Sequence, residues 1–296
     1  MSNIILWNSR EFKYAPVRPA GPHYLAFWLR QYGYTVKVID FCNLLSTQDL
    51  VAITEKHITS DTKAIGVSTT FWKDESWSPD EPLWVSSARS IIENRKPTLY
   101  WLLGGASSHN PKLNYEWIKF HGYAEDTILK WMDENSNKLR LRPIFDIKSC
   151  KGAEFTHDDF IQSHEVIPIE LGRGCQFKCS FCSYPLVGKK KGTYIRDFRL
   201  IREEFIRNYN EYGTTWYYFL DDTLNESEEK VQILADIAQS LPFELSWTGY
   251  NRADLIWSKP ETANWLKDSG LKSCTFGIES FHPGASRAVG KRSEER

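Results

Sequence analysis

The sequence predicts an α/β protein in which an open, doubly wound parallel sheet is followed by a partial (β/α) barrel. Short apolar runs alternate with longer amphipathic runs along most of the chain, which is the rhythm of strands and helices in parallel sheets. The chain has 296 residues, enough for about two domains. Hydrophobic residues make up 41% and charged residues 25%, so we expect packed hydrophobic cores rather than disorder.

Residues 1–135 are predicted to form a Rossmann-like domain. Gly33 readily takes the left-handed conformation that ends a helix, and Thr47 is a candidate N-cap. Ligands bind such sheets beyond the carboxyl ends of the strands, where Gly104 and Gly105 are found. We expect strands at 3–7, 35–40, 64–70, 98–105 and 117–122, and helices at 21–34, 47–58, 81–96 and 124–135.

Residues 136–165 lose this periodicity and gain charge, so we predict a linker there. The alternation resumes over 166–296, which we expect to form a partial barrel of the TIM type. Chemistry in a parallel barrel gathers at the carboxyl ends of its strands, and the polar clusters of this part fall at those ends. We expect strands at 166–172, 214–222, 243–251 and 272–280, and helices at 198–213, 227–241, 259–270 and from 283 onward.

Charge and hydropathy restrict the partners of the chain. Lysine and arginine number 37 against 38 acids, so the net charge of −1 gives no overall attraction to nucleic acid or to an anionic membrane. No stretch approaches the length of a membrane span, and the N-terminus lacks the features of a secretory signal. We therefore expect a cytoplasmic protein. The lysine run 189–191, with Tyr184 nearby, could contact RNA or a phosphorylated substrate, but such a run is more often a solvated loop.

Three of the six cysteines, Cys175, Cys179 and Cys182, lie within eight positions. A structural zinc ion needs four protein ligands, and Cys150 and His164 could supply a fourth only by folding back. A four-iron cluster also prefers four thiolates, so three leave one iron open to an outside ligand. The spacing predicts such a cluster. The alternative is a zinc-stabilised module that binds nucleic acid without catalysis.

The segment ELGRGCQFKCSFCSYP resembles the cluster-binding loop of the radical S-adenosylmethionine (SAM) enzymes. Their signature is CxxxCxxC with an aromatic residue before the last cysteine, and Phe181 stands there. The resemblance implies a [4Fe-4S] cluster on the three cysteines, with SAM chelated at the open iron and cleaved reductively to a 5′-deoxyadenosyl radical. It also implies an electron donor such as flavodoxin or ferredoxin, and a small-molecule or peptide substrate that the sequence does not identify.

Two further segments resemble parts of the SAM pocket of this family. YFLDDTLN is similar to the segment beside the methionine amine, so Asp221 or Asp222 could accept hydrogen bonds from that ammonium. Either could equally cap a helix or complement its dipole. NRADL resembles the third-strand segment in which an arginine faces the cofactor. Arg252 could equally pair with Asp254 or Asp222.

FGIESFHPG is similar to the fourth-strand GxES segment of the same family. Glu279 and Ser280 could hold the ribose hydroxyls or the carboxylate of the cofactor, because a carboxylate can accept hydrogen bonds from two hydroxyl groups at once. Ser280 could also be a plain turn residue. No residue is assigned a catalytic role. Family barrels usually continue through a fifth and a sixth strand, so we expect the C-terminal part of the barrel to be missing, with an exposed edge strand and poor behaviour in isolation.

The N-terminal part resembles, through GVSTTF and LLGGASSH, the cobalamin-binding domains that precede many radical SAM barrels. Gly104 and Gly105 would let the nucleotide tail of cobalamin pass close to the backbone. The resemblance implies possible methyl transfer. The chain lacks the Asp-x-His-x-x-Gly motif, and His23 stands without its spacing, so we do not expect a histidine ligand to cobalt. A sheet without cobalamin, shaping substrate access, is the alternative.

Overall fold

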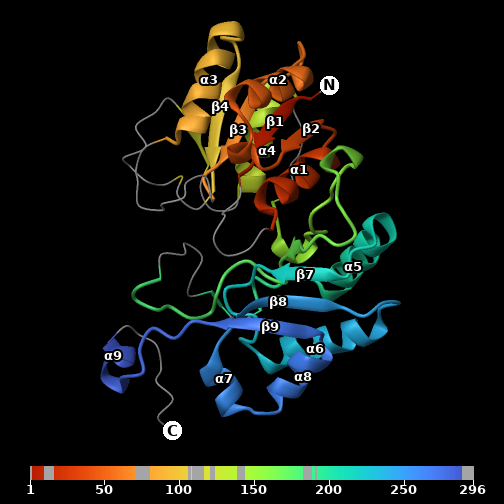
Figure 1. Ribbon diagram of the computed structural model, residues 1–296, viewed down its shortest axis with the longest axis vertical. Helices are drawn as coiled ribbons and strands as arrows, with labels where there is room; N and C mark the ends of the chain where they lie inside the picture. The colour runs from red at the N-terminus through yellow and green to blue at the C-terminus, as the bar shows by residue number, and fades with distance from the viewer. Residues whose placement is uncertain are drawn as a thin grey trace. The chain divides into compact units, whose positions relative to one another are not determined.

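The computed structural model describes residues 2–9, 17–70, 81–105, 108, 117–120, 124–138, 144–182, 189–190 and 192–288. Tyr184, Lys191 and the last residues of the helix predicted from 283 lie outside these ranges. The chain forms two compact units, each built on a parallel sheet (Figure 1). The first contains Met1–Phe145 and Ala153–Phe160, and the second contains Asp146–Gly152 and Ile161–Arg296. The segment predicted as a linker therefore contributes residues to both units.

The first unit has a five-stranded sheet in the order β2-β1-β3-β4-β5, with every neighbouring pair parallel. In this order the direction of winding reverses between β1 and β3, which is the point where doubly wound sheets bind ligands. The strands are almost wholly apolar because helices cover both of their faces. Their bounds are β1 Ile4–Trp7, β2 Val36–Ile39, β3 Ala64–Ser68, β4 Tyr100–Gly104 and β5 Ile118–Lys119.

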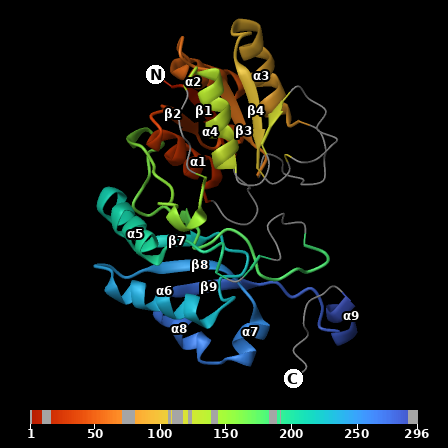
Figure 2. The same ribbon diagram turned by 180° about the vertical axis from the view of Figure 1, so that it is seen from behind.

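Helices pack on both faces of this sheet, and Figures 1 and 2 show the layers from opposite sides. Ile5 and Trp7 of β1 join the core with α2 and α3, while Ile4 and Leu6 join the core with α1 and α4. This division follows from the alternation of side chains along a strand. The bounds are α1 Gly21–Gln31, η1 Cys42–Leu44, α2 Thr47–His57, α3 Leu83–Arg95, α4 Ala124–Asn135 and η3 His157–Asp159.

The second unit has a four-stranded parallel sheet in the chain order β6-β7-β8-β9, as in part of a parallel barrel. The α/β prediction is thus confirmed for both sheets. An aromatic core of Phe205, Tyr217, Phe219 and Trp247 packs edge to face. The bounds are η2 Ile147–Ser149, β6 Ile167–Ile169, α5 Phe198–Tyr212, β7 Trp216–Phe219, α6 Glu228–Ser240, β8 Ser246–Asn251, α7 Ala253–Ser258, α8 Thr262–Asp268, β9 Leu271–Phe276 and α9 Pro283–Ala288.

Local sequence explains the start of α2 and the end of α1. Helix α2 is capped by Ser46, whose side chain accepts a hydrogen bond from Asp49 N at 3.1 Å, so the prediction of Thr47 as the N-cap was wrong by one residue. Gly33 has a φ of 77° just after α1, as expected for a left-handed helix end. Over the described residues, no helix combines the length and apolar character needed to cross a membrane.

Candidate functional site

The cysteine loop begins just after β6, at the carboxyl end of the first strand of the second sheet. Cys175 is buried, Cys179 is half-buried and Cys182 is exposed. Cys182 N donates to Cys179 O at 3.1 Å, so a turn joins the last two cysteines. Phe181, beside Cys182, is 49% exposed. Gly172 lets the loop pass close to a neighbouring segment, because a Cβ there would lie 2.7 Å from Tyr194 O.

The three cysteines do not form a single-ion site. Within the described ranges, their sulfur atoms are not within 4.8 Å of one another as a group, whereas ligands of one ion must crowd around it. A four-iron cluster is itself larger, so it holds its thiolates farther apart. Burial raises the pKa of the Cys175 thiol, and a hydrogen bond with the Thr223 hydroxyl, 3.6 Å away, partly offsets this. Metal binding at Cys175 would therefore displace a proton.

A network of buried charged side chains contacts the start of this loop. Asp221 Oδ2 accepts a hydrogen bond from Leu171 N at 2.8 Å, and Asp221 Oδ1 accepts one from Lys230 Nζ at 2.7 Å. Lys230 Nζ also donates to Glu226 Oε1 at 3.0 Å. Glu226 in turn accepts from the Tyr194 hydroxyl. Both oxygens of Asp221 thus hold protein partners, and they fasten the start of the loop to the second strand.

Lys230 balances two carboxylates in this network while being only 2% exposed. Burial alone would lower its pKa, but the charges of Asp221 and Glu226 raise it, so the ammonium stays charged. Gln176 Nε2 donates to Glu226 O at 2.7 Å, which adds a direct tie to the residue after Cys175. The network therefore holds the start of the cysteine loop in place through hydrogen bonds.

Asp222 differs from its neighbour because its side chain is exposed. Desolvation by the surrounding protein and, to a smaller extent, the negative charge of Asp221 raise the pKa of Asp222 to about 7, and the charge of Lys230 opposes them. Because water reaches this carboxyl group, solvent screening moderates the shift. Of the two predicted aspartates, Asp222 is the one with a carboxylate directed to solvent.

Arg252 pairs with Asp254, one of the two partners that the sequence left open. Its Nε and Nη2 atoms donate to the two carboxylate oxygens at 2.9 and 2.6 Å. The guanidinium carbon lies 4.1 Å from the centre of the Phe177 ring, and a side-chain interaction with Cys179 adds to the effect of Asp254 in raising the pKa of Arg252 against burial. The structure thus brings Arg252 to the cysteine loop.

Glu279 and Ser280 follow β9 and begin the turn toward α9. Glu279 is exposed, and Ser280 Oγ accepts a hydrogen bond from His282 N at 3.0 Å. Ser280 therefore has the turn function that the sequence allowed. Its role toward a cofactor stays a prediction.

The carboxyl edge of the first sheet carries polar groups that sequence reasoning missed. Asn8 Oδ1 and Ser9 Oγ, just after β1, are buried and have no hydrogen-bond partner within the described part of the chain. They lie at the switch point between β1 and β3, which depends on strand order and leaves no local signal. A polar ligand at this edge would satisfy them.

The two glycines predicted at this edge have different surroundings. Among the described residues, apart from its chain neighbours, none has an atom within 4 Å of the place where a Cβ of Gly104 would stand. Gly105 has a φ of 98°, and its Cβ would meet the hydroxyl oxygens of Thr69 and Thr70 at 2.9 Å. Gly104 is thus open to an approaching group, whereas Gly105 serves the tight contact between β4 and the end of β3.

Comparison with known proteins agrees with this architecture. Residues 169–296 match the family model of the radical SAM superfamily, so the second unit carries a radical SAM domain and the resemblance of its cysteine loop is confirmed. Over 304 aligned residues the chain is 26% identical to an uncharacterised methyltransferase of Pyrococcus horikoshii, covering 92% of this chain and 63% of that protein. It is also 26% identical over 132 residues to the bacteriochlorophyllide d C-12(1)-methyltransferase of Chlorobaculum tepidum, covering 44% of this chain and 28% of that enzyme.

Two solved structures share the fold of nearly the whole chain. One is OxsB, a cobalamin-dependent SAM radical enzyme with aqua-cobalamin and SAM bound, with a TM-score of 0.72, 13% identity, and coverage of 99% of this chain and 46% of OxsB. The other is the radical SAM methyltransferase TsrM from Kitasatospora setae with cobalamin and a [4Fe-4S] cluster bound, with a TM-score of 0.69, 13% identity, and coverage of 99% and 63%. The chain thus spans less than two thirds of the length of each of these relatives.

Proposed function

We propose that this chain is the core of a radical SAM enzyme that binds a [4Fe-4S] cluster through Cys175, Cys179 and Cys182. The observation that carries the proposal is the three-cysteine loop at the end of β6 inside a matching radical SAM domain. When bound, the cluster and SAM would supply reductive cleavage of the sulfonium, giving a 5′-deoxyadenosyl radical. The zinc-module alternative has no support from the spacing of the sulfur atoms in the described residues.

The residues around the loop fit this task. The network of Asp221, Glu226 and Lys230 fixes the loop, so its thiolates are pre-positioned. Arg252 adds a positive charge beside Cys179, which favours a net negative group in the loop. Asp222 offers an exposed carboxylate for the ammonium of SAM, and Glu279 and Ser280 are proposed for its hydroxyls or carboxylate.

We also propose that the first unit binds cobalamin and that the reaction is a methyl transfer. OxsB and TsrM support this through their bound cobalamin, and the relatives above support it through their methyltransferase names. The buried oxygens of Asn8 and Ser9 and the open approach at Gly104 fit a polar ligand at this edge. His23 is fully buried and stands outside the Asp-x-His-x-x-Gly spacing, so we do not propose it as the ligand of a cobalt held in a corrin ring.

Anaerobic reconstitution with iron and sulfide tests the proposal. We expect a brown protein that cleaves SAM when dithionite is added, and a Cys179→Ala variant that does neither. A colourless protein that holds one zinc ion would refute the enzyme and support the zinc module.

Retention of hydroxocobalamin through gel filtration separately tests the cobalamin site. Loss of the pink colour on the column would refute cobalamin binding and leave the radical SAM proposal standing.

The partners and location remain proposals of the same kind. An external one-electron donor such as flavodoxin or ferredoxin would reduce the cluster, and the substrate would be a small molecule or a peptide. We place the protein in the cytoplasm, since a reducing compartment keeps cluster-binding thiols available.

A further inference from the structure

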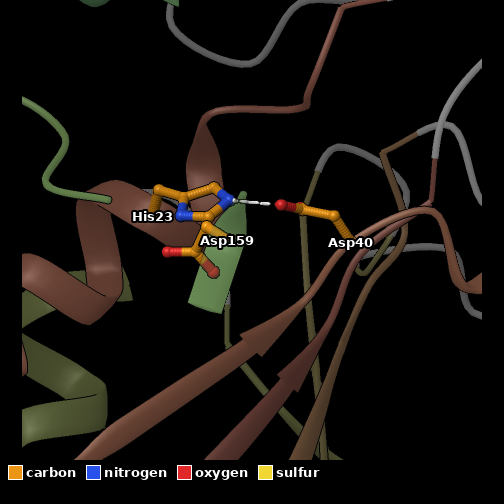
Figure 3. Close-up of side chains that lie close together, drawn as sticks. All are labelled: His23, Asp40 and Asp159. Carbon is orange, nitrogen blue, oxygen red and sulfur yellow. Dashed lines mark hydrogen bonds and ion pairs between the residues drawn. The ribbon is translucent and has the colours of Figure 1, made fainter. Parts of the chain in front are cut away.

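The first unit gathers a histidine and two aspartates from three distant parts of the chain. His23 lies in the first turn of α1, Asp40 follows β2, and Asp159 ends the short helix η3. One possible ligand atom from each lies within 4.8 Å of the other two (Figure 3). Their side chains are 0%, 5% and 2% exposed. Burying ionisable side chains costs free energy unless they are paired with one another or coordinate a metal ion.

The hydrogen bonds of His23 fix which ring nitrogen remains available. Its Nε2 atom lies 2.9 and 3.1 Å from the two oxygens of Asp40. Asp40 also accepts from Arg18 Nη1 at 2.6 Å and Asn8 Nδ2 at 2.8 Å. With Arg18 and Asn8 also donating to it, the Asp40 carboxylate acts as the acceptor, so Nε2 of His23 donates in this contact.

This arrangement leaves Nδ1 of His23 buried and without a hydrogen-bond partner in the described ranges. Figure 3 shows Asp40 at the Nε2 side of the ring and the carboxylate of Asp159 beside the rest of it. Metal-binding histidines in proteins commonly donate their second ring N–H to a carboxylate, which orients the ring and raises its basicity. The pair of His23 and Asp40 has this geometry.

Asp159 supplies a second possible ligand atom. Its Oδ2 atom accepts from Thr156 N at 2.6 Å and from Thr156 Oγ1 at 2.9 Å. Its Oδ1 atom lies 3.9 Å from Lys37 Nζ, which is longer than a hydrogen bond. Asp159 therefore brings a carboxylate next to a buried imidazole whose Nδ1 has no partner in the described residues.

We propose that His23, through Nδ1, and Asp159 bind a divalent transition-metal ion of the Zn²⁺ or Mn²⁺ class, with Asp40 orienting the imidazole from its Nε2 side. Imidazole and carboxylate ligands suit such ions, whereas thiolate-seeking ions would prefer the cysteine loop. The positive charges of Arg18 and Lys37 weaken the site.

The ion would fasten the segment Ala153–Phe160 to the rest of the first unit. That segment is otherwise held by contacts such as Arg30 Nη1 to Glu154 O at 3.1 Å, and the rings of His23 and Phe155 at 4.6 Å. Because His23 and Asp159 are far apart in sequence, a metal bound only to the folded chain stabilises it by mass action.

Mn²⁺ titration of the full chain, with its cluster already reconstituted, tests this inference. Electron paramagnetic resonance of the free ion gives the bound fraction. We expect one Mn²⁺ per chain, displaced by Zn²⁺, and at least a tenfold loss of affinity in His23→Gln and Asp159→Asn. The matched control is Asp158→Asn, which removes the same charge one position away from an exposed side chain and should bind like the wild type.

Thermal unfolding supplies the second measurement. Mn²⁺ should raise the melting temperature of the wild type and of Asp158→Asn, and should leave Asp159→Asn unchanged. If His23→Gln does not fold, Asp159→Asn decides alone. A wild type that binds neither ion would overturn the inference, and Nδ1 of His23 would then simply be protonated. Equal Mn²⁺ binding by Asp159→Asn would also overturn it, because the ion would then lie elsewhere.

Discussion

Replacing Lys230 with methionine should severely destabilise the second unit. Methionine keeps much of the length and apolar volume of the side chain but removes the ammonium that lies 2.7 Å from Asp221 Oδ1 and 3.0 Å from Glu226 Oε1. Two carboxylates, 3% and 2% exposed, would then face each other without a counter-charge. Removing one partner from a buried ion pair costs about 3–5 kcal/mol, so we expect a loss of this size in the free energy of unfolding.

Calorimetry gives the assay for this prediction. For a domain of this size each kcal/mol shifts the melting temperature by about 2–4 °C, so the second unit should melt roughly 6–20 °C lower. Lys259→Met is the matched control, because Lys259 pairs with Glu228 at the surface with its side chain 51% exposed. An exposed pair contributes about 0–1 kcal/mol. A Lys230→Met loss no larger than that of the control would refute the view that the buried ammonium holds the loop.

Three further predictions concern the cysteine loop and its surroundings. Cys182→Ala should abolish iron binding and visible absorbance after reconstitution, while Cys274→Ala, outside the loop, should keep both; equal iron in the two variants would contradict the three-thiolate site. Because the folded pKa of Asp222 is raised to about 7, the folded state holds its proton above the unfolded value of 3.8, so stability falls as pH rises between these values. Asp222→Asn should lack this loss and gain stability relative to the wild type from pH 4 to 7 in denaturant titrations, and parallel pH profiles would argue against the shift. Gly172→Ala should cost about 1–3 kcal/mol because its Cβ would lie 2.7 Å from backbone Tyr194 O, whereas Gly21→Ala, whose Cβ meets no atom of the described residues within 4 Å beyond its chain neighbours, should cost little, as unfolding of the two variants would reveal.

The elements that sequence periodicity predicts are those whose buried faces are continuous along the chain. The strands found in the described residues lie within the ranges predicted for them or start one residue earlier. In the first sheet, β1 and β3 are buried and apolar because helices cover both of their faces. The helix predicted over 259–270 was wrong in its start. The structure has α7 at Ala253–Ser258 and then α8 at Thr262–Asp268, with Pro260 between them. The short helix α7 was missed because six residues carry too little periodicity.

Some parts of the candidate site could be predicted from the sequence, and others needed the structure. The cysteine loop could be found because its ligands lie within eight positions, and local spacing records such a site. The choice of Asp254 as partner of Arg252 needed the structure, since sequence allowed two aspartates. The hydrogen bond from Leu171 N to Asp221 Oδ2 joins residues 50 positions apart, and the sequence around either residue does not predict it. Long-range polar contacts depend on strand order, which periodicity does not encode.

The exchange of short segments between the two units has a consequence for anyone who wants to express one unit alone. Cutting the chain before β6 would remove Asp146–Gly152, which belongs to the second unit. That piece supplies Cys150 O, which accepts from Arg196 Nε at 2.9 Å, and Lys148 O, which accepts from Asp197 N at 3.1 Å. A fragment starting there would keep the radical SAM domain match yet leave a fully buried guanidinium short of an acceptor. A fragment that starts at Asp146 carries along Ala153–Phe160 without the strands that hold it, so neither cut yields a complete unit.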